Sequence, residues 1–446
     1  MKKPIAERYT YWDWKLFLSI LLYLSIPPIY QSYSLYLIGN TPPRDNNLAI
    51  VSQWQFIQVA LEVIQEALVF PLFFYIGSQW RERQEALFQR ARDVFFYLLI
   101  ILAPAILLLY FGMGAFVEGI NTTEALRMAT TDFLRIKLGA LFLGIINAGL
   151  IIMVESLRKK RILLYLLFLK LLLSVVFDSW FFGGYSFSLS LGVKGVALSN
   201  ILTEFLIFLV SAAYFYRLLG APLKQYFRLP ALSDFHLFRN ISQWIALESL
   251  IRNVAYFFMI LQLMNVLGPK QIGGYYLAMH LFWSFALLPF SALAETMKAL
   301  IANSSDKRMA VKKILGNGLL LGIGALLLWL AALPALKNII ALFTNDPEIA
   351  GFAGQAIFFL FFPYLLLALN LLLDTLFIGL GQTKYLAYQS ILTNLGVYGV
   401  AFTLYQFHLW TPTFTSILLL FGIGILVDSL LTVWYARMLL TSSPQT

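Results

Sequence analysis

The sequence predicts an all-α integral membrane protein with twelve transmembrane helices in two pseudo-symmetric six-helix lobes. Of its 446 residues, 60% are hydrophobic and only 12% are charged, and the mean hydropathy is +0.78. A soluble protein of this length needs a more polar surface. Apolar runs of about twenty residues, the length of a helix that crosses a bilayer, recur along the whole chain. These observations predict a multi-pass membrane protein.

The apolar runs define the twelve predicted spans. The first run is longer than the apolar region of a signal peptide, and no small-residue cleavage site follows it, so we expect it to be a span. The spans cover residues 14–38, 50–77, 93–117, 132–154, 162–183, 194–217, 240–266, 272–300, 312–335, 352–379, 384–406 and 413–436.

Basic residues alternate between the two sides of the predicted membrane. Of the 32 Lys and Arg residues, 22 lie in the termini and in the loops that follow even-numbered spans, whereas 5 lie in the opposite loops. Because cytoplasmic loops carry the excess of Lys and Arg, both termini are predicted to lie in the cytoplasm and the protein in the cytoplasmic membrane. The same rule explains the net charge of +10 better than nucleic-acid binding does.

The longest polar connection, Arg217 to Asn240, divides the chain into two halves. We expect an N-terminal lobe over residues 1–218, a cytoplasmic linker over 219–238 and a C-terminal lobe over 239–446. Spans two and eight echo each other, since each ends before a basic loop. Weak internal symmetry of this kind is common in secondary transporters, and it is also compatible with the major facilitator fold.

The residue types exclude several kinds of chemistry. There is no cysteine, so disulfides, thiolate metal sites and cysteine nucleophiles are excluded. The three histidines, His236, His280 and His408, are not at metal-ligand spacing. No nucleophile–base pattern occurs within the spans, so we do not expect an enzyme or a resident cofactor.

The second span carries a polar stripe. An ionisable residue in the middle of a membrane helix costs about 2.5–3.5 kcal/mol, so each one needs a reason. Spacings of three and four place the polar residues on one face of a helix. The stripe consists of Gln55, Gln58, Glu62, Gln65 and Glu66. We expect it to line water or a polar interface and to bind substrate or protons.

The eighth span repeats this pattern with His280, Ser284, Ser291, Glu295 and Lys298. Two stripes at corresponding positions favour a central cavity between the halves. The alternative is a polar seam in which the halves pack and Glu295 pairs with Lys298. A dry seam would require a partner for every carboxylate.

Four further acids lie within spans six, seven, ten and twelve. Glu248 and Arg252 are four residues apart in the favoured order, which indicates a structural salt bridge, although Glu248 also remains a substrate or proton candidate. Glu204, Asp374 and Asp428 are isolated acids, each as compatible with a hydrogen bond to a neighbouring helix as with a ligand. We retain Asp374 as a substrate or proton candidate.

Asp178 stands within the apolar run LLSVVFDSW of span five. Ser174 lies one turn earlier on the same face, so the two residues offer a carboxylate and a hydroxyl at positions i and i+4. A hard monovalent cation such as Na⁺ prefers several oxygen ligands. The alternative is an interfacial or capping aspartate.

Three segments together resemble the multidrug and toxic compound extrusion (MATE) family. VVFDSWFFGGYSFSLSLGVKGVALSN (175–200) is similar to the family's Asp-containing end of span five, short outer loop and Gly-x-x-Gly-x-Ala segment. FIGLGQTKY (377–385) resembles the Arg-Gly-x-Gly-x-Thr turn after span ten, with Ile378 where arginine is usual. LSIPPIY (24–30) resembles the proline-bent first helix.

The resemblance implies a twelve-helix antiporter that exports organic, often cationic compounds against a Na⁺ or H⁺ gradient. It also implies an ion site at Asp178, with Ser174 in the place of an asparagine and a span-six polar residue near Asn200. The family's span-one aspartate has no counterpart here, since only Tyr33 and Ser34 lie nearby. The family's C-lobe acids are about one turn out of register with Glu248 and Asp374.

We therefore expect a secondary active exporter, monomeric, whose partners are a small organic substrate, a monovalent cation and lipid. Acidic stripes beside Trp54, Trp283 and Phe285 suit flat cations. The first alternative is a flippase of lipid-linked oligosaccharides or lipids from the same superfamily, which predicts a cationic cavity. A further alternative is a membrane scaffold, which predicts polar seams without access of water.

Overall fold

The computed structural model describes residues 12–40, 44–77, 84–120, 122–156, 160–219, 235–302, 308–380, 382 and 384–441. Every regular element in these ranges is helical. In the first half of the chain the helices are α1 (Trp14–Asn40), α2 (Arg44–Ser52), α3 (Trp54–Gly77), α4 (Gln84–Gly119), the short 3₁₀ turn η2 (Glu124–Leu126), α5 (Arg127–Ser156), α6 (Lys160–Phe181) and α7 (Val193–Leu219).

The second half contains more interruptions. Its elements are α9 (Phe235–Tyr256), η4 (Phe257–Gln262), α10 (Leu263–Leu267), α11 (Pro269–Leu281), η5 (Phe282–Ala286), α12 (Leu288–Ala302), α13 (Arg308–Ala332), η6 (Leu333–Ala335), α14 (Leu336–Phe343), α15 (Pro347–Gly379), α16 (Lys384–Thr393), η7 (Asn394–Gly399), α17 (Val400–Gln406) and α18 (Phe414–Thr441). Three of these, η4, η5 and η7, are short π-helical segments inside predicted spans.

The predicted all-helical membrane fold is confirmed, and helices occupy all twelve predicted spans. In the described part of the chain, 9 helices are long and apolar enough to cross a membrane, and a bent pair, Pro269–Ala286 with Leu288–Ile301, brings the number to 10. The number twelve stays a prediction. Two short helices were not predicted as separate elements: α2, which begins before the predicted span 50–77, and α14, which follows the predicted span 312–335.

The chain forms two compact units. One consists of Ile29–Gly273 and Phe343–Pro347, and we call it the α3–α7 unit after its main helices. The other consists of Met1–Pro28, Gly274–Leu342 and Glu348–Thr446. The predicted lobes 1–218 and 239–446 stay a prediction, and most of the predicted linker lies outside the described residues.

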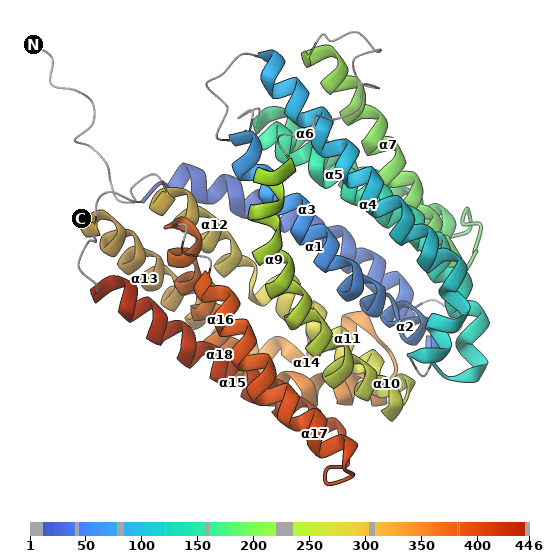
Figure 1. Ribbon diagram of the computed structural model, residues 1–446. Coiled ribbons are helices and arrows are strands. Elements are labelled where there is room, and N and C mark those ends of the chain that lie inside the picture. Colours follow the sequence, from blue (N-terminus) through green and yellow to red (C-terminus); the bar gives the residue numbers. More distant parts are fainter. Residues whose placement is uncertain are drawn as a thin grey trace, which may run out of the picture. The chain divides into compact units, whose positions relative to one another are not determined.

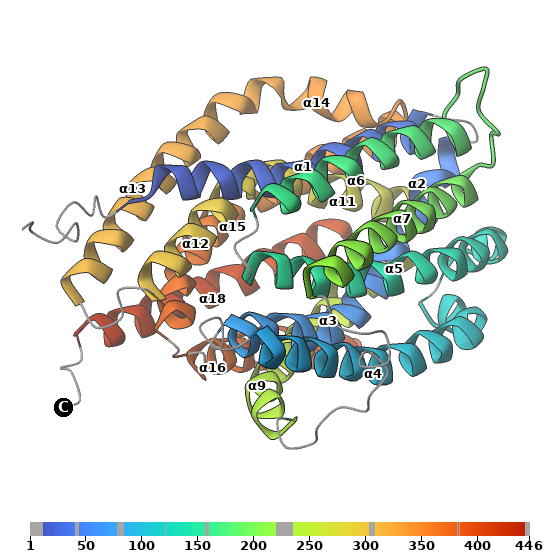
Figure 2. The same cartoon turned by 90° about the horizontal axis from the view of Figure 1, so that it is seen from above.

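Helix α5 is the centre of the α3–α7 unit. It packs against α3, α4, α6 and α7, and α6 packs in turn against α7 (Figures 1 and 2). The start of α7 lies very close to the end of α6, because a Cβ atom at Gly195 would stand only 2.6 Å from the carbonyl oxygen of Phe181. The loop between them folds back, with Leu191 N–H donating to Phe181 O at 2.9 Å. These contacts hold the first turns of α7 beside Asp178.

The second unit is built around α12, α13, α15, α16 and α18. Helix α12 packs against α13, and α16 packs against α18. A Cβ atom at Gly422 of α18 would stand 2.9 Å from the ring of Pro363 in α15, so the small residue allows these two helices to approach closely.

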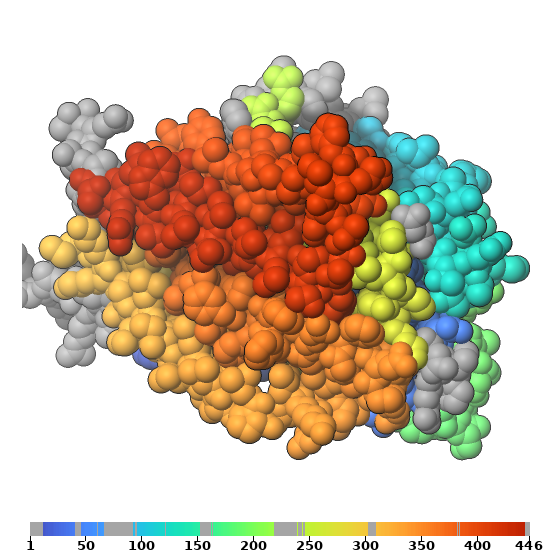
Figure 3. Space-filling view, turned by 90° about the horizontal axis from the view of Figure 1, so that it is seen from below, coloured from blue at the N-terminus to red at the C-terminus, as the bar shows by residue number. Residues whose placement is uncertain are grey.

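Large apolar side chains are exposed along helices of both units. Examples are Phe111 in α4 and Phe168 in α6, at 77% and 62% exposure, and Leu328 in α13 and Phe358 in α15, at 69% and 78%. In Figure 3 the residues coloured orange to red, from the last third of the chain, cover a broad area of the face shown. Helices whose outer faces are this apolar match a lipid environment.

Candidate functional site

Asp178 lies on the last turns of α6 and is 1% exposed. The hydroxyl of Ser34 in α1 donates a hydrogen bond to its Oδ2 atom. Its other oxygen, Oδ1, is buried and has no hydrogen-bond partner among the described residues. One of the two oxygen atoms of this buried carboxylate thus makes no hydrogen bond within the described residues. An unmade hydrogen bond in the interior costs about 1–3 kcal/mol, so binding of an ion or another polar group at this atom would be favourable.

Polar groups from α1 and α7 surround this carboxylate. Ser199 of α7 is fully buried and is a near neighbour of Asp178, but its hydroxyl completes no hydrogen bond within the described part of the chain. Tyr33 of α1 lies close enough to interact electrostatically with Asp178. The Tyr33 hydroxyl is 2.7 Å from Ser179 Oγ and 3.3 Å from the Tyr185 hydroxyl. The site is therefore rich in oxygen atoms.

Lys137 supplies a positive charge from α5. Its ammonium group interacts electrostatically with Asp178. Its Nζ atom lies 4.9 Å from the ring centroid of Trp54 in α3 and 5.5 Å from that of Phe133. Lys137 lies within the predicted span 132–154 and was not among the predicted site residues. Nothing in the local sequence connects it with a residue 41 positions further along the chain.

Neither predicted neighbour of Asp178, Ser174 or Asn200, forms a hydrogen bond with it among the described residues. Ser174 is buried one turn away on α6, but no hydrogen bond joins it to Asp178 among the described residues. Asn200 is half-buried, and its neighbour Ser199 is the α7 residue near the carboxylate. One residue along a helix turns a side chain by about 100°. Ser34, which the sequence analysis named only in place of the missing span-one aspartate, is a direct partner.

A second lysine–acid pair lies along α6. Lys170 Nζ is 2.5 Å from Glu204 Oε1 on α7. Asn147 of α5 donates to the other carboxylate oxygen, Oε2, at 2.7 Å and to the main-chain oxygen of Glu204 at 2.9 Å. Lys170 also lies 5.9 Å from the ring centroid of Tyr30. Glu204 therefore bonds to neighbouring helices, one of the two alternatives left open for it.

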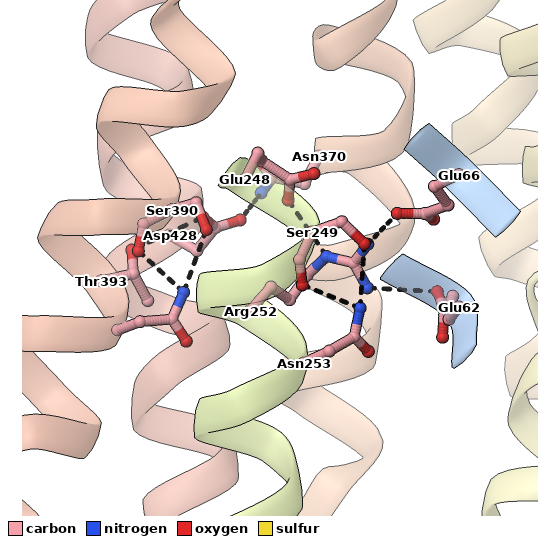
Figure 4. A network of polar contacts seen from close by, with 11 residues as sticks. Glu62, Glu66, Glu248, Ser249, Arg252, Asn253, Asn370, Ser390, Thr393 and Asp428 are labelled. Carbon is pink, nitrogen blue, oxygen red and sulfur yellow. Dashed lines mark hydrogen bonds and ion pairs between the residues drawn. The ribbon is translucent and has the colours of Figure 1, made fainter. Parts of the chain in front are cut away.

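Arg252 on α9 brings the acids of the second span together (Figure 4). Its guanidinium nitrogens lie 3.0 Å from Glu248 Oε1, 3.3 Å from Glu62 Oε1 and 2.8 Å from Glu66 Oε2. The predicted Glu248–Arg252 pair is present, and it extends to α3. We call these four residues the Arg252 cluster. Three carboxylates around one guanidinium leave an excess of negative charge, and the Arg252 side chain is 41% exposed.

The glutamines of the stripe differ in their surroundings. Gln58 is exposed and Gln55 is half-buried, with its Oε1 atom buried and unpartnered among the described residues. Ile57, between them, is completely buried. Gln53, which was not predicted as part of the stripe, is 3% exposed and donates to Asn265 Oδ1 at 2.9 Å. Gln53 lies between α2 and α3, where it ties the start of α3 to α10.

The candidates of the second unit do not form one cluster. His280 Nδ1 lies 3.2 Å from Ser284 Oγ, and the predicted local pair of Glu295 and Lys298 is present at 2.7 Å. Asp374 is half-buried. Asp428 accepts a hydrogen bond from Asn370 at 2.7 Å and lies 3.5 Å from Thr393 (Figure 4). Within the described ranges, no group of three or more His, Cys, Asp or Glu residues could hold a metal ion.

Comparison with known proteins gives a match to one family over part of the chain and a shared fold over nearly all of it. Residues 245–403 match the family MatE. The fold is similar to that of a multidrug resistance MATE family transporter of the MOP superfamily in an inward-facing conformation, with a TM-score of 0.77 at 16% identity over 96% of this chain and 99% of that one. An outward-facing MATE transporter gives a TM-score of 0.74 at 15% identity, covering 97% of this chain and 96% of that chain.

A third similar structure is a MOP superfamily transporter from Pyrococcus furiosus, for which a binding pocket of reverse polarity suggests a different function. Its TM-score is 0.72 at 14% identity, over 97% of this chain and 96% of that one. No curated protein sequence matches the chain. The predicted MATE-like fold is confirmed, and the match of residues 245–403 to MatE agrees with it.

Proposed function

We propose that this transporter is an antiporter that exports organic, mainly cationic compounds and is driven by a gradient of Na⁺ or H⁺. The observation that carries the proposal is the Asp178 site, where a buried carboxylate keeps one oxygen open beside the hydroxyl groups of Ser34 and Ser199. A single carboxylate with neutral oxygen ligands suits a monovalent cation or a proton. Ser174 and Asn200 stay candidate ligands.

The Arg252 cluster supports a cationic substrate. Its three carboxylates outnumber its guanidinium, and Glu62 is 34% exposed, so the excess negative charge is accessible. Gln55, Gln58, Glu66 and Glu248 belong to this proposed site. His280, Glu295 and Asp374 stay candidates in the second unit. Binding of the ion and of the substrate would favour opposite-facing states, which is the condition for antiport.

We propose that the protein lies in the cytoplasmic membrane with both termini in the cytoplasm, on the basis of the asymmetry of Lys and Arg among the loops. We also propose that it is a monomer. A flippase of lipid-linked oligosaccharides is the second candidate because the superfamily includes a transporter with a pocket of reverse polarity. The acidic balance of the Arg252 cluster favours the exporter.

Transport by the purified protein in liposomes tests the proposal. Na⁺ and H⁺ gradients are imposed separately, and movement of the organic cation ethidium is followed by its fluorescence with DNA trapped inside. We expect movement that depends on one of the two gradients. Gradient-independent scrambling of a fluorescent lipid-linked sugar, without ethidium movement, would favour the flippase. The absence of both activities from correctly folded protein would contradict both candidates.

A further inference from the structure

The charge of Lys137 is the feature of the Asp178 site that the proposed function does not use. A lysine within a membrane-spanning bundle is costly and normally pairs with a carboxylate. Here the ammonium acts on Asp178 electrostatically, but it lies over the faces of Trp54 and Phe133 and leaves Asp178 Oδ1 without a hydrogen-bond partner in the described part of the protein. The described contacts of the ammonium group are thus with the aromatic rings, and its interaction with the carboxylate is electrostatic.

The groups around the pair come from four helices. Facing Asp178 are Lys137 of α5, Tyr33 and Ser34 of α1, and Ser199 of α7. Among these described neighbours, the one formal positive charge is that of Lys137. Facing Lys137 are Asp178 and the two rings. The ammonium thus has two alternative sources of stabilisation, which are the carboxylate and the aromatic faces.

We propose that Lys137 is a tethered cation that competes with the transported monovalent cation for Asp178, and that Trp54 holds its ammonium group away from the carboxylate. The inference rests on the proposed function, since it assumes that Asp178 is the ion site. When the lysine lies over the ring, the Oδ1 atom is open to an incoming ion. When the lysine moves to the carboxylate, the charge is already neutralised and the ion is excluded.

The physical basis is the low dielectric of the bundle. Two positive charges that share one buried carboxylate repel each other and leave a net charge in the interior. Cation–π contact stabilises a partly desolvated ammonium group, so the rings compete with the carboxylate for Lys137. Small changes in either partner should therefore shift the balance in opposite directions.

Direct binding of ²²Na⁺ to the purified full-length protein tests this, with choline chloride to keep the ionic strength constant. Lys137→Gln removes the competing charge and should strengthen Na⁺ binding about tenfold or more. Trp54→Leu removes the ring and should weaken Na⁺ binding several-fold, because the ammonium group then moves to Asp178. The double variant Lys137→Gln with Trp54→Leu should bind Na⁺ as tightly as Lys137→Gln alone, because the ring affects Na⁺ binding only through the lysine charge.

Two further variants keep the test decisive. Lys137→Arg keeps the charge and should bind Na⁺ no more tightly than the wild type. Lys194→Gln removes a lysine that pairs with Asp132 at 2.6 Å on the exposed end of the bundle, and it should leave Na⁺ binding unchanged. Thermal unfolding of each variant shows that it is folded. The inference is overturned if Lys137→Gln binds Na⁺ no better than the wild type, or if Trp54→Leu binds it more tightly. Transport by Asp178→Asn judges the proposed function separately.

Discussion

Two lysine–acid pairs lie in the same helical bundle and differ in how completely they are satisfied. In the Lys170–Glu204 pair the ammonium contacts the carboxylate at 2.5 Å, and Asn147 occupies the second oxygen at 2.7 Å. In the Lys137–Asp178 pair the ammonium lies over aromatic rings and Oδ1 is open. A saturated carboxylate can hold helices together but has no room for a ligand. An unsaturated one costs stability and can bind an ion.

On the proposed function, we therefore expect a structural role for the first pair and a transport role for the second. Both acids lie on helices that pack together, α6 and α7, so differences in helix environment do not explain the contrast. The difference is the position of the lysine relative to its acid. Variants of the two pairs should therefore affect stability and transport in opposite ways.

The largest effect on stability is expected for Glu204→Ala. This substitution leaves the buried ammonium of Lys170 without a carboxylate, which costs about 3–5 kcal/mol in comparable buried pairs. We expect a clear fall in the thermal unfolding midpoint in detergent, measured by the exposure of buried tryptophan. Asp178→Asn should change the midpoint much less, because it removes a carboxylate that lacks part of its hydrogen bonding. Equal losses for both would remove the contrast.

Replacing both residues of the Lys170–Glu204 pair by apolar residues tests whether their charges are needed for transport. The double variant Lys170→Met with Glu204→Leu removes both buried charges and fills similar volume, so most of the stability lost in Glu204→Ala should return. Its ethidium transport should stay within about twofold of the wild type. Loss of transport in a stable double variant would show that the Lys170–Glu204 pair carries ions.

An intermediate effect is expected at the Arg252 cluster. Glu66→Gln removes the carboxylate that lies 2.8 Å from Arg252 and reduces the excess negative charge. Because this cluster is partly exposed, the unfolding midpoint should change little. The affinity for ethidium should fall several-fold, as measured by fluorescence polarisation with the purified protein. Gln65→Glu, which adds an acid to the same stripe, is the matched control and should not weaken binding.

The smallest effect is expected from single cysteine substitutions. The chain has no native cysteine, so each introduced thiol can be labelled on its own. Gln58 is exposed and Ile57 is completely buried. Gln58→Cys should react with a water-soluble maleimide, whereas Ile57→Cys should react only after denaturation. Equal protection of both positions would place the stripe in a dry seam and favour the scaffold.

Local sequence was sufficient to predict the helices, the isolated acid Asp178 and the acidic stripe. Hydropathy and spacings of three and four residues contain this information. The partners of these acids depend on contacts between distant helices. Lys137, Ser34 and Arg252 come from helices α5, α1 and α9, and a one-residue difference on α7 brings Ser199 rather than Asn200 to Asp178. A single sequence does not specify these distances.

The most direct test of the contrast is gradient-driven ethidium transport in liposomes by two variants measured side by side. These are Asp178→Asn and the double variant Lys170→Met with Glu204→Leu, each reconstituted at equal density with the wild type. The account predicts that Asp178→Asn loses gradient-driven transport while it still binds ethidium, and that the double variant transports like the wild type. Normal transport by Asp178→Asn under both the Na⁺ and the H⁺ gradient would contradict it and would make Asp178 an interfacial aspartate.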